Sequence, residues 1–171
     1  MKKNLIQNLG LLAFVFLVFA SISNAQGEKS SPPKTAEGEI NGSKITINYH
    51  SPSVKGRTIW GDLVPLGQVW RAGANDATTF ESSKEIKIQG QILAPGKYSF
   101  FIIPGESESI MIFNKVAKQW GAYSYDESQD ALRVKVPSIL GTNFEEKLVY
   151  EVQPDGFEIR WEYAKTRAKI E

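Results

Sequence analysis

The segment with the widest range of chemistry is residues 57–76, RTIWGDLVPLGQVWRAGAND. Arg57 and Arg71 carry planar guanidinium groups, which bind a carboxylate, sulfate or phosphate through parallel hydrogen bonds. Trp60 and Trp70 offer flat apolar faces for a sugar ring or another planar group. Together these residue types predict a loop that binds a small polar or anionic ligand, with a saccharide as one option.

Three further residues complete the predicted ligand-binding set. Asn75 and Asp76 can fix hydroxyl groups, and Trp120 in KQWGAY can form a wall. The same cluster also has a purely structural interpretation. Tryptophans are mostly buried, so those of the loop would close one end of the fold, and one of its arginines would pair with Asp62 or Asp76. Both interpretations stay open at this level.

Catalysis has weaker support in the sequence. His50 is the one histidine of the chain, and its ordinary pKa suits a general base, so a hydrolase using His50 or Asp62 is the second hypothesis. A single exposed histidine is more often simply solvated, and no G-x-S-x-G nucleophile motif occurs. One histidine and no cysteine also exclude multi-histidine and thiolate metal sites.

A calcium loop and a nucleotide cofactor are both disfavoured. Asp126, Ser128 and Asp130 have the alternating spacing that opens a calcium loop. Ala131 stands where the glycine of such a loop is required, and Pro137 stands where its bidentate glutamate is required. No glycine-rich dinucleotide motif or phosphate-binding loop is present. We therefore expect no metal and no cofactor.

The N-terminus predicts export. Residues 1–25 combine Lys2 and Lys3, an apolar run and a small-x-small site, which is the layout of a cleaved secretory signal peptide. Residues 26–35 are polar and proline-containing and predict a flexible leader, so 36–171 would be a single domain. Without residues 1–25 the chain keeps 18 basic and 19 acidic side chains, which argues against nucleic acid as a partner. No later segment is apolar enough to predict a transmembrane helix.

Alternating hydrophobicity and turn residues predict the elements that position these side chains. Asn41-Gly42 and Gln89-Gly90 mark two hairpin turns, and residues 153–156 mark a third. The expected strands lie at residues 45–50, 78–82, 86–88, 98–103, 110–113, 120–125, 132–136, 148–152 and 157–163. Apolar side chains on both faces of 98–103 indicate a central strand. A short helical turn is expected near residues 59–64, where apolar residues are spaced by four.

These strands predict an all-β fold, a single-domain β-sandwich of about nine or ten strands with little helix. Jelly-roll and immunoglobulin-like topologies are both compatible with the pattern. After the loss of Phe14, Phe16 and Phe19 with the signal peptide, 16 aromatic residues remain to fill the core.

Three motifs together resemble a family of secreted bacterial proteins, the domain of unknown function numbered 2911. They are YHSPSVKGRTIWGDLVPLGQVWRAGANDATTF, LAPGKYSFFIIPG and IMIFNKVAKQWGAYSYDESQDALRVKV. The resemblance implies a signal peptide and an all-β domain, and it brings no reaction or catalytic residue. The chain departs from the family pattern at Leu66 and Ser109, where many members carry an aromatic residue.

The leading hypothesis is therefore an exported binding module, periplasmic or extracellular, without catalysis of its own. The hydrolase is the first alternative. The second is an envelope protein whose 57–76 loop meets a partner protein. The sequence leaves the oligomeric state open.

Overall fold

The computed structural model describes residues 31–171. The predicted signal peptide, 1–25, and most of the predicted leader lie outside the described residues. The prediction that the leader extends to residue 35 is wrong at its end, because Pro33, Lys34 and Thr35 already belong to the first strand. Polar residues can form this strand because most of its side chains are exposed and the backbone pairs along only one edge with the next strand.

The described residues form nine strands and one short 3-10 turn. Their bounds are β1 Pro33–Ile40, β2 Ser43–His50, β3 Thr78–Ser82, β4 Ile86–Ile88, β5 Gln91–Leu93, β6 Gly96–Ile103, β7 Glu108–Asn114, η1 Glu127–Gln129, β8 Asp130–Gln153 and β9 Gly156–Lys169. The all-β prediction is confirmed. No helix in this described part of the chain is long and apolar enough to cross a membrane.

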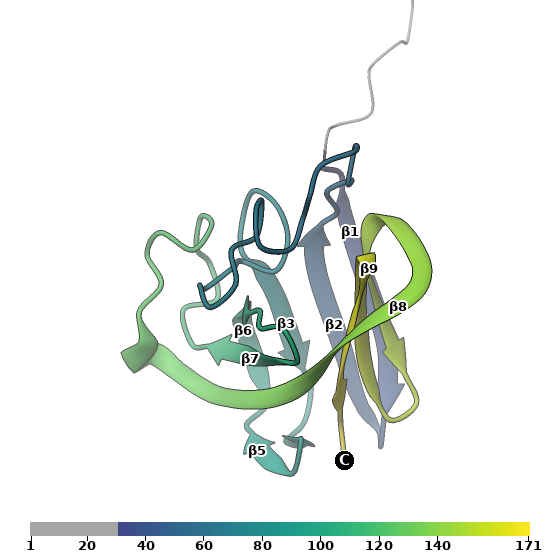
Figure 1. The fold of residues 1–171 in the computed structure, drawn as a ribbon. Coiled ribbons are helices and arrows are strands. Elements are labelled where there is room, and N and C mark those ends of the chain that lie inside the picture. The colour runs from purple at the N-terminus through teal and green to yellow at the C-terminus, as the bar shows by residue number, and fades with distance from the viewer. Residues whose placement is uncertain (1–30) are drawn as a thin grey trace, which may run out of the picture.

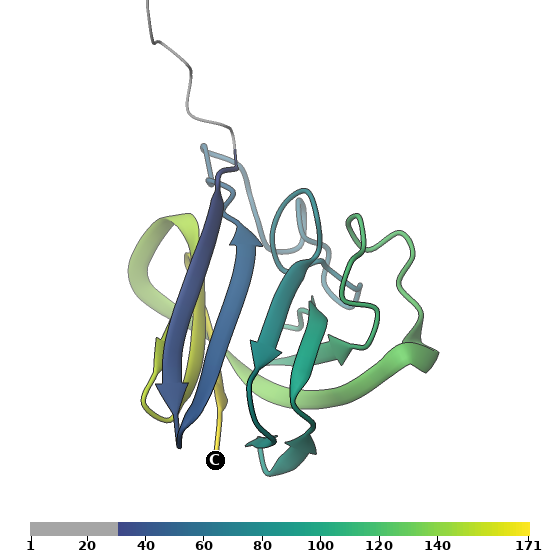
Figure 2. The same ribbon diagram turned by 180° about the vertical axis from the view of Figure 1, so that it is seen from behind.

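Seven strands form one antiparallel sheet in the order β1-β2-β3-β6-β7-β8-β9, and β4 pairs with β5 in a small hairpin (Figure 1). The large sheet is strongly coiled, so that its two halves face each other across the core, as in a β-sandwich (Figures 1 and 2). Neighbouring strands follow one another along the chain, with only the β4–β5 hairpin inserted. The described strands thus form a meander and lack the Greek-key crossovers of the jelly-roll and immunoglobulin-like alternatives.

The long strand β8 closes this arrangement. Its first part pairs with β7, and its second part pairs with β9 through two register shifts between Leu140 and Val149. The edge of β8 then meets the chain that follows β2, because Leu148 N donates to Pro52 O at 2.9 Å and Val54 N donates to Glu146 O at 2.8 Å. The coil of the sheet thus brings residues from both ends of the domain together.

Aromatic side chains from both halves of the sheet fill the core. The ring of Phe80 on β3 lies 5.0 Å from Phe113 on β7 and 5.4 Å from Phe157 on β9, measured between centroids. Strand β6 is buried on both faces, as expected: Phe100 faces this main core and Phe101 faces a smaller cluster on the opposite side. Packing of this density holds the frame rigid without any disulfide.

The predicted hairpin turns are confirmed, and one predicted strand is wrong. Asn41 and Gly42 have φ values of 51° and 76°, which is the geometry that an Asn-Gly turn favours. Residues 120–125 form a turn instead of a strand. Gly121 has a φ of 63°, and Tyr125 N donates to Ala122 O at 3.3 Å, so the backbone bends where a strand would run straight.

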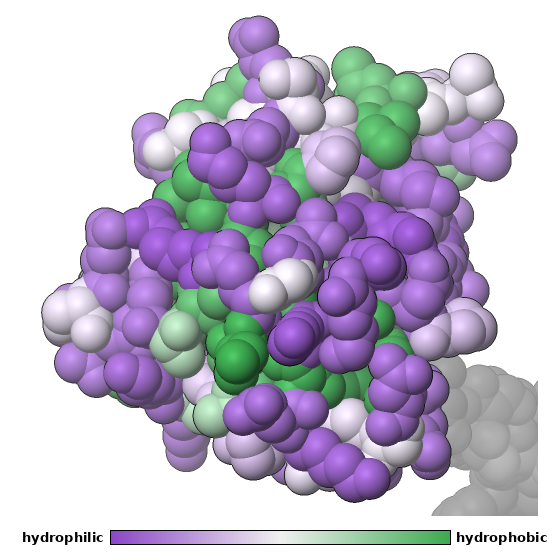
Figure 3. Space-filling model, turned by 90° about the horizontal axis from the view of Figure 1, so that it is seen from below, coloured by the Kyte–Doolittle hydropathy of each residue, from purple (hydrophilic) through white to green (hydrophobic). Residues whose placement is uncertain are grey.

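The two long connections, residues 51–77 and 115–129, gather at the same end of the sheet, at the top in Figures 1 and 2. An antiparallel bridge joins Asp76 to Trp120 between them. The β4–β5 hairpin lies at the opposite end, where Ile88 bridges to Ile170. That opposite end, seen in Figure 3, is mostly covered by hydrophilic side chains, with hydrophobic areas between them.

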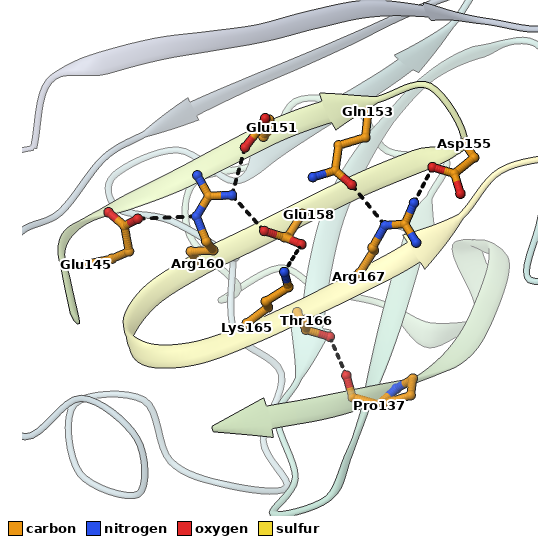
Figure 4. A network of polar contacts seen from close by, with 10 residues as sticks. All are labelled: Pro137, Glu145, Glu151, Gln153, Asp155, Glu158, Arg160, Lys165, Thr166 and Arg167. Atoms are coloured by element: carbon orange, nitrogen blue, oxygen red, sulfur yellow. Dashed lines mark hydrogen bonds and ion pairs between the residues drawn. The ribbon is translucent and has the colours of Figure 1, made fainter. Parts of the chain in front are cut away.

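A network of charged side chains lies on the β8–β9 hairpin (Figure 4). At its centre is Glu158, which is only 3% exposed. Its two carboxylate oxygens accept from Arg160 Nη1 at 2.7 Å and from Lys165 Nζ at 2.5 Å. Burial alone would raise the pKa of Glu158, but the hydrogen bonds from Lys165 and Arg160 outweigh burial and hold this pKa below its ordinary value.

Candidate functional site

The connection 51–77 is an ordered loop, and its apolar side chains anchor it to the main core. Ile59, Val64 and Ala72 are buried in the main core. Val64 N donates to Ile59 O at 2.8 Å, and Trp70 pairs with Ile102 beyond the end of β3. The expected helical turn is absent, since the Val64–Ile59 bond spans five residues instead of four and closes a wider turn.

Three tryptophans meet beneath this loop. Trp60 and Trp70 come from the loop, and Trp161 comes from β9. The rings of Trp70 and Trp161 are stacked at 5.8 Å between centroids, and Trp60 packs edge-on against both, at 5.7 Å and 6.1 Å. Trp161 is buried, while the two loop tryptophans stay half-buried. The cluster is thus partly core and partly open surface.

A cavity of about 460 Å³ on one side of the cluster is cationic. Trp70 and Trp161 form its apolar wall, and Lys55, Arg57 and Arg71 bring the charge. No aspartate or glutamate lines this cavity within the described part of the chain. Three positive charges gathered around one cavity attract an anion. Lys55 and Arg57 are exposed and Arg71 is half-buried, so the Arg71 charge is the least screened of the three.

The arginines do not form the ion pairs that the structural interpretation required. Arg57 donates from Nε to Val54 O at 3.0 Å and from Nη2 to Ser53 O at 2.5 Å, which fixes its guanidinium over its own turn. Arg71 Nε is buried and has no hydrogen-bond partner among residues 31–171. Two backbone carbonyls thus orient Arg57, whereas the described residues provide no partner for Arg71 Nε.

Buried side chains of the core fix the backbone next to Arg71 by hydrogen bonds. Ala72 adopts a φ of 54°, a left-handed conformation that costs a residue other than glycine about 1 kcal/mol. Its carbonyl oxygen accepts from the Tyr150 hydroxyl at 2.6 Å and from Thr78 Oγ1 at 2.9 Å. Burial raises the pKa of Tyr150 well above its ordinary value, so this hydroxyl remains a donor at neutral pH.

Lys55 was not among the site residues predicted from sequence. It occupies the Lys55-Gly56 turn, and both residues have positive φ, 48° and 67°. The Glu146 carboxylate caps the backbone nitrogen of Lys55 at 3.0 Å, so this acid stabilises the turn. The pattern VKGR marks a turn with two nearby cations, but their common cavity with Arg71 follows only from the fold.

A second cavity of about 380 Å³ lies on the other side of the tryptophans and is apolar. It shares Trp70 and Trp161 with the cationic cavity and adds Trp60. Its remaining lining comes from the 51–77 loop, the end of β6, the β6–β7 connection, the start of β7 and the β8–β9 hairpin: Leu66, Ile102, Pro104, Gly105, Glu106, Ser109, Ser138, Ile139, Leu140, Ile159, Ala164, Lys165 and Thr166. Trp161, which the sequence placed only in a hairpin core, is therefore central to both cavities.

Three residues of the predicted ligand-binding set lie outside both cavities. Asn75 is exposed, and its carbonyl oxygen accepts from Gly121 N at 3.2 Å. Asp76 faces a separate, shallow hollow together with His50, and Trp120 is 63% exposed beside it. These residues lie where the two long loops meet, so four of the seven predicted ligand-binding residues, Arg57, Trp60, Trp70 and Arg71, line the two cavities.

No catalytic arrangement is evident around His50 or Asp62. His50 lies at the end of β2, and no hydrogen bond of its imidazole ring is found within residues 31–171. Asp62 is exposed in the loop and lines neither of the two cavities at the tryptophans. A hydrolase needs a base within hydrogen-bonding reach of a substrate position. Neither residue lines the two cavities at the tryptophans, and His50 instead lines the separate hollow that it shares with Asp76.

The aspartates of segment 126–130 accept hydrogen bonds from nearby residues and stabilise the local fold. Asp126 caps η1 by accepting from Ser128 N at 2.9 Å. Asp130 accepts from Asn114 Nδ2 at 2.9 Å and from the Tyr125 hydroxyl at 2.6 Å. Across the described residues there is no group of three or more histidine, cysteine or acidic side chains that could hold a metal ion.

Comparison with known proteins gives one family and no assigned function. A family model described as "Protein of unknown function (DUF2911)" matches residues 31–171. This range includes all strands and both cavities described above. No curated protein and no solved structure gives a significant match.

Proposed function

Since the chain belongs to the DUF2911 family, which has no assigned function, we propose from the site itself that it binds a small anionic molecule in the cationic cavity. The observation that carries this proposal is the grouping of Lys55, Arg57 and Arg71 around about 460 Å³ without an acidic lining residue in the part that the structure describes. A cavity of this size accommodates a small-molecule ligand.

Arg71 is the proposed main contact. An anion that binds the guanidinium group of Arg71 gains charge-assisted hydrogen bonds, each worth about 1.5–3 kcal/mol. The preset orientation of Arg57 lowers the entropy lost on binding. A carboxylate or sulfate group therefore fits this pair of arginines better than a neutral ligand does.

Trp70 and Trp161 supply the rest of the recognition. Their apolar faces beside the cations suit a planar ring or the apolar face of a sugar, so an acidic saccharide remains within the proposed ligand class. We further propose that the domain acts after export, in the periplasm or outside the cell. This rests on the signal-peptide pattern of residues 1–25 alone.

Isothermal titration calorimetry on residues 26–171 tests the proposal. The probes are sulfate, acetate, benzoate and glucuronate, with glucose as the neutral counterpart of glucuronate. We expect at least one anion to bind, and glucose to bind much more weakly than glucuronate. Raising NaCl from 0.05 to 0.3 M should weaken binding, because the charges lie at a partly open cavity.

Variants at Arg71 assign the binding to this cavity. Arg71→Gln should weaken binding of the anion about tenfold or more, since a charge-assisted hydrogen bond is worth about 1.5–3 kcal/mol. Lys118→Ala is a suitable control, because Lys118 is exposed and lies outside the cavity. Unchanged affinity of Arg71→Gln, or equal loss in Lys118→Ala, would contradict the proposal.

A further inference from the structure

The apolar cavity beside the cationic one is lined by few polar side chains, and most of these already have partners within the described residues. The hydroxyl oxygens of Ser109 and Ser138 bond to each other at 2.6 Å. Lys165 is already paired with Glu158 at 2.5 Å. Glu106, the one other charged residue in the lining, would repel an anion. Burial of apolar surface is therefore the only large source of binding energy in this cavity.

The mouth of this cavity leaves large apolar side chains in water. Leu66, Ile139 and Leu140 are 40%, 52% and 77% exposed, and all three line the cavity. Contiguous apolar surface of this kind marks a binding site more often than it marks a neutral surface. A ligand that enters the cavity would cover these side chains and release their hydration water.

The two cavities lie on either side of one wall. Trp70 and Trp161 line both, and their rings are stacked at 5.8 Å between centroids. Lys55, Arg57 and Arg71 thus line a cavity that adjoins the apolar cavity at Trp70 and Trp161. One molecule can occupy both cavities if it carries a charge at one end and an apolar body at the other.

We infer that the ligand is an amphipathic anion, an alkyl or aryl chain that ends in a carboxylate or sulfate. Its charged end binds at Arg71 and its apolar body passes over Trp70 into the apolar cavity of about 380 Å³. This inference rests on the proposed function, because the cationic cavity must hold the charged end. It adds the chemical class of the ligand.

A homologous series tests the inference. Straight-chain carboxylates from acetate to dodecanoate are titrated below their micellar concentrations, and the 1-alkanols of the same lengths serve as uncharged controls. We expect Kd to fall about fourfold with each added methylene, the factor that corresponds to burial of one methylene group, until the cavity is full. The alkanols should bind at least tenfold more weakly, and Arg71→Gln should remove this difference.

Two variants place the chain in the apolar cavity. Ala164→Phe fills part of the cavity, so the gain per methylene should stop at a shorter chain than in the wild type. Leu140→Ser removes apolar surface at an exposed mouth position and should weaken long-chain binding several-fold, even if Ala164→Phe fails to fold. Ile92→Ser is the matched control, because Ile92 is 57% exposed on β5 and lines neither cavity.

The outcomes separate this inference from the proposed function. If short anions bind through Arg71 with no dependence on chain length, the inference is overturned and the proposed function stands. If alkanols bind as tightly as carboxylates, the two cavities do not act on one ligand, and the inference is again overturned. If no anion of any length binds, both are overturned.

Discussion

The indole nitrogen of Trp60 donates a hydrogen bond of 3.3 Å to the backbone carbonyl oxygen of Trp161. The two rings also pack edge-on, with their centroids 6.1 Å apart. Trp60 belongs to the 51–77 loop and Trp161 to the last strand, so this pair fixes the loop onto the β8–β9 hairpin. Both residues line the apolar cavity.

We expect Trp60→Ala to lower the free energy of unfolding by about 2–3 kcal/mol, through loss of aromatic packing and of this hydrogen bond. The backbone amides of Val64 and Trp70 should exchange faster with solvent. Their hydrogen bonds to Ile59 O and Ile102 O form only when the 51–77 loop is packed against the sheet. Urea unfolding and amide hydrogen exchange measure the two effects. Trp120→Ala is the control and should cost under about 0.5 kcal/mol, because Trp120 is 63% exposed. Equal loss in both variants would contradict the role assigned to Trp60.

Gly38 on β1 determines how closely β1 approaches β8. A Cβ atom on Gly38 would lie 2.6 Å from Val152 Cγ1, well inside contact distance. Gly38→Ala should therefore cost about 1–3 kcal/mol. In the double variant with Val152→Ala, part of this loss should be recovered, because the clashing methyl groups are gone. A double-mutant cycle in urea measures the coupling, and strictly additive losses would show that the two strands do not meet as described.

The Tyr150 hydroxyl should hold the backbone next to Arg71 in place through its hydrogen bond to Ala72 O. Tyr150→Phe removes the 2.6 Å hydrogen bond to Ala72 O and should lower the free energy of unfolding by about 1–1.5 kcal/mol. Thr78 Oγ1 still donates to the same oxygen, so the fold should survive. We also expect weaker anion binding, since Ala72 directly follows Arg71. Tyr98→Phe is the matched control: it removes a bond of 2.9 Å to Ala94 O, far from the cavity, and anion affinity should not change.

Glu158 should make stability depend on pH in the acid range. Its pKa is lower in the folded protein than in the unfolded chain, where it is about 4.3. Its contribution is therefore complete above about pH 4.3 and is lost as the pH falls through the lowered folded value. Glu158→Gln should cost about 1–3 kcal/mol at pH 7, because it leaves Arg160 and Lys165 without their buried partner.

Urea unfolding of both proteins at pH 7 and pH 3 checks this dependence. The stability difference between wild type and Glu158→Gln should shrink at pH 3. Glu151→Gln removes another carboxylate that accepts from Arg160, but the side chain of Glu151 is 50% exposed, so its effect should stay below about 0.5 kcal/mol at either pH. A Glu158→Gln difference that is the same at both pH values would falsify the assignment.

Local patterns predicted those elements whose structure depends on near neighbours. The Asn41-Gly42 turn, the Gln89-Gly90 turn and the doubly buried strand around Phe100 all follow from turn chemistry and side-chain alternation. The prediction was wrong at Lys34, where strand pairing orders a polar segment that has no alternation of its own. The prediction of a strand at residues 120–125 was also wrong. Gly121 adopts a left-handed φ and turns the backbone of this aromatic-rich segment.

The candidate site was predicted only in part. Arg57, Arg71, Trp60 and Trp70 do line the two cavities, since one continuous loop carries them. Asn75 and Asp76 do not, because the chain leaves the cationic cavity after Ala74, before it enters β3. Trp120 does not either, because it lies in the other long connection. Lys55 and Trp161 were missed as site residues. No local pattern shows that the Lys55-Gly56 turn and Trp161 on β9, which are far apart in the sequence, line the same cavity.

The sequence by itself determined that this chain forms short antiparallel strands around an aromatic core, because side-chain alternation and turn residues act over a few positions. Only the tertiary structure decided which cations share a cavity and that Trp161 lines both the cationic and the apolar cavity. Distances between such side chains depend on how the sheet coils and where β8 bends, and many distant contacts set both. The fold class is thus a property of local sequence, while the site is a property of the closed sheet.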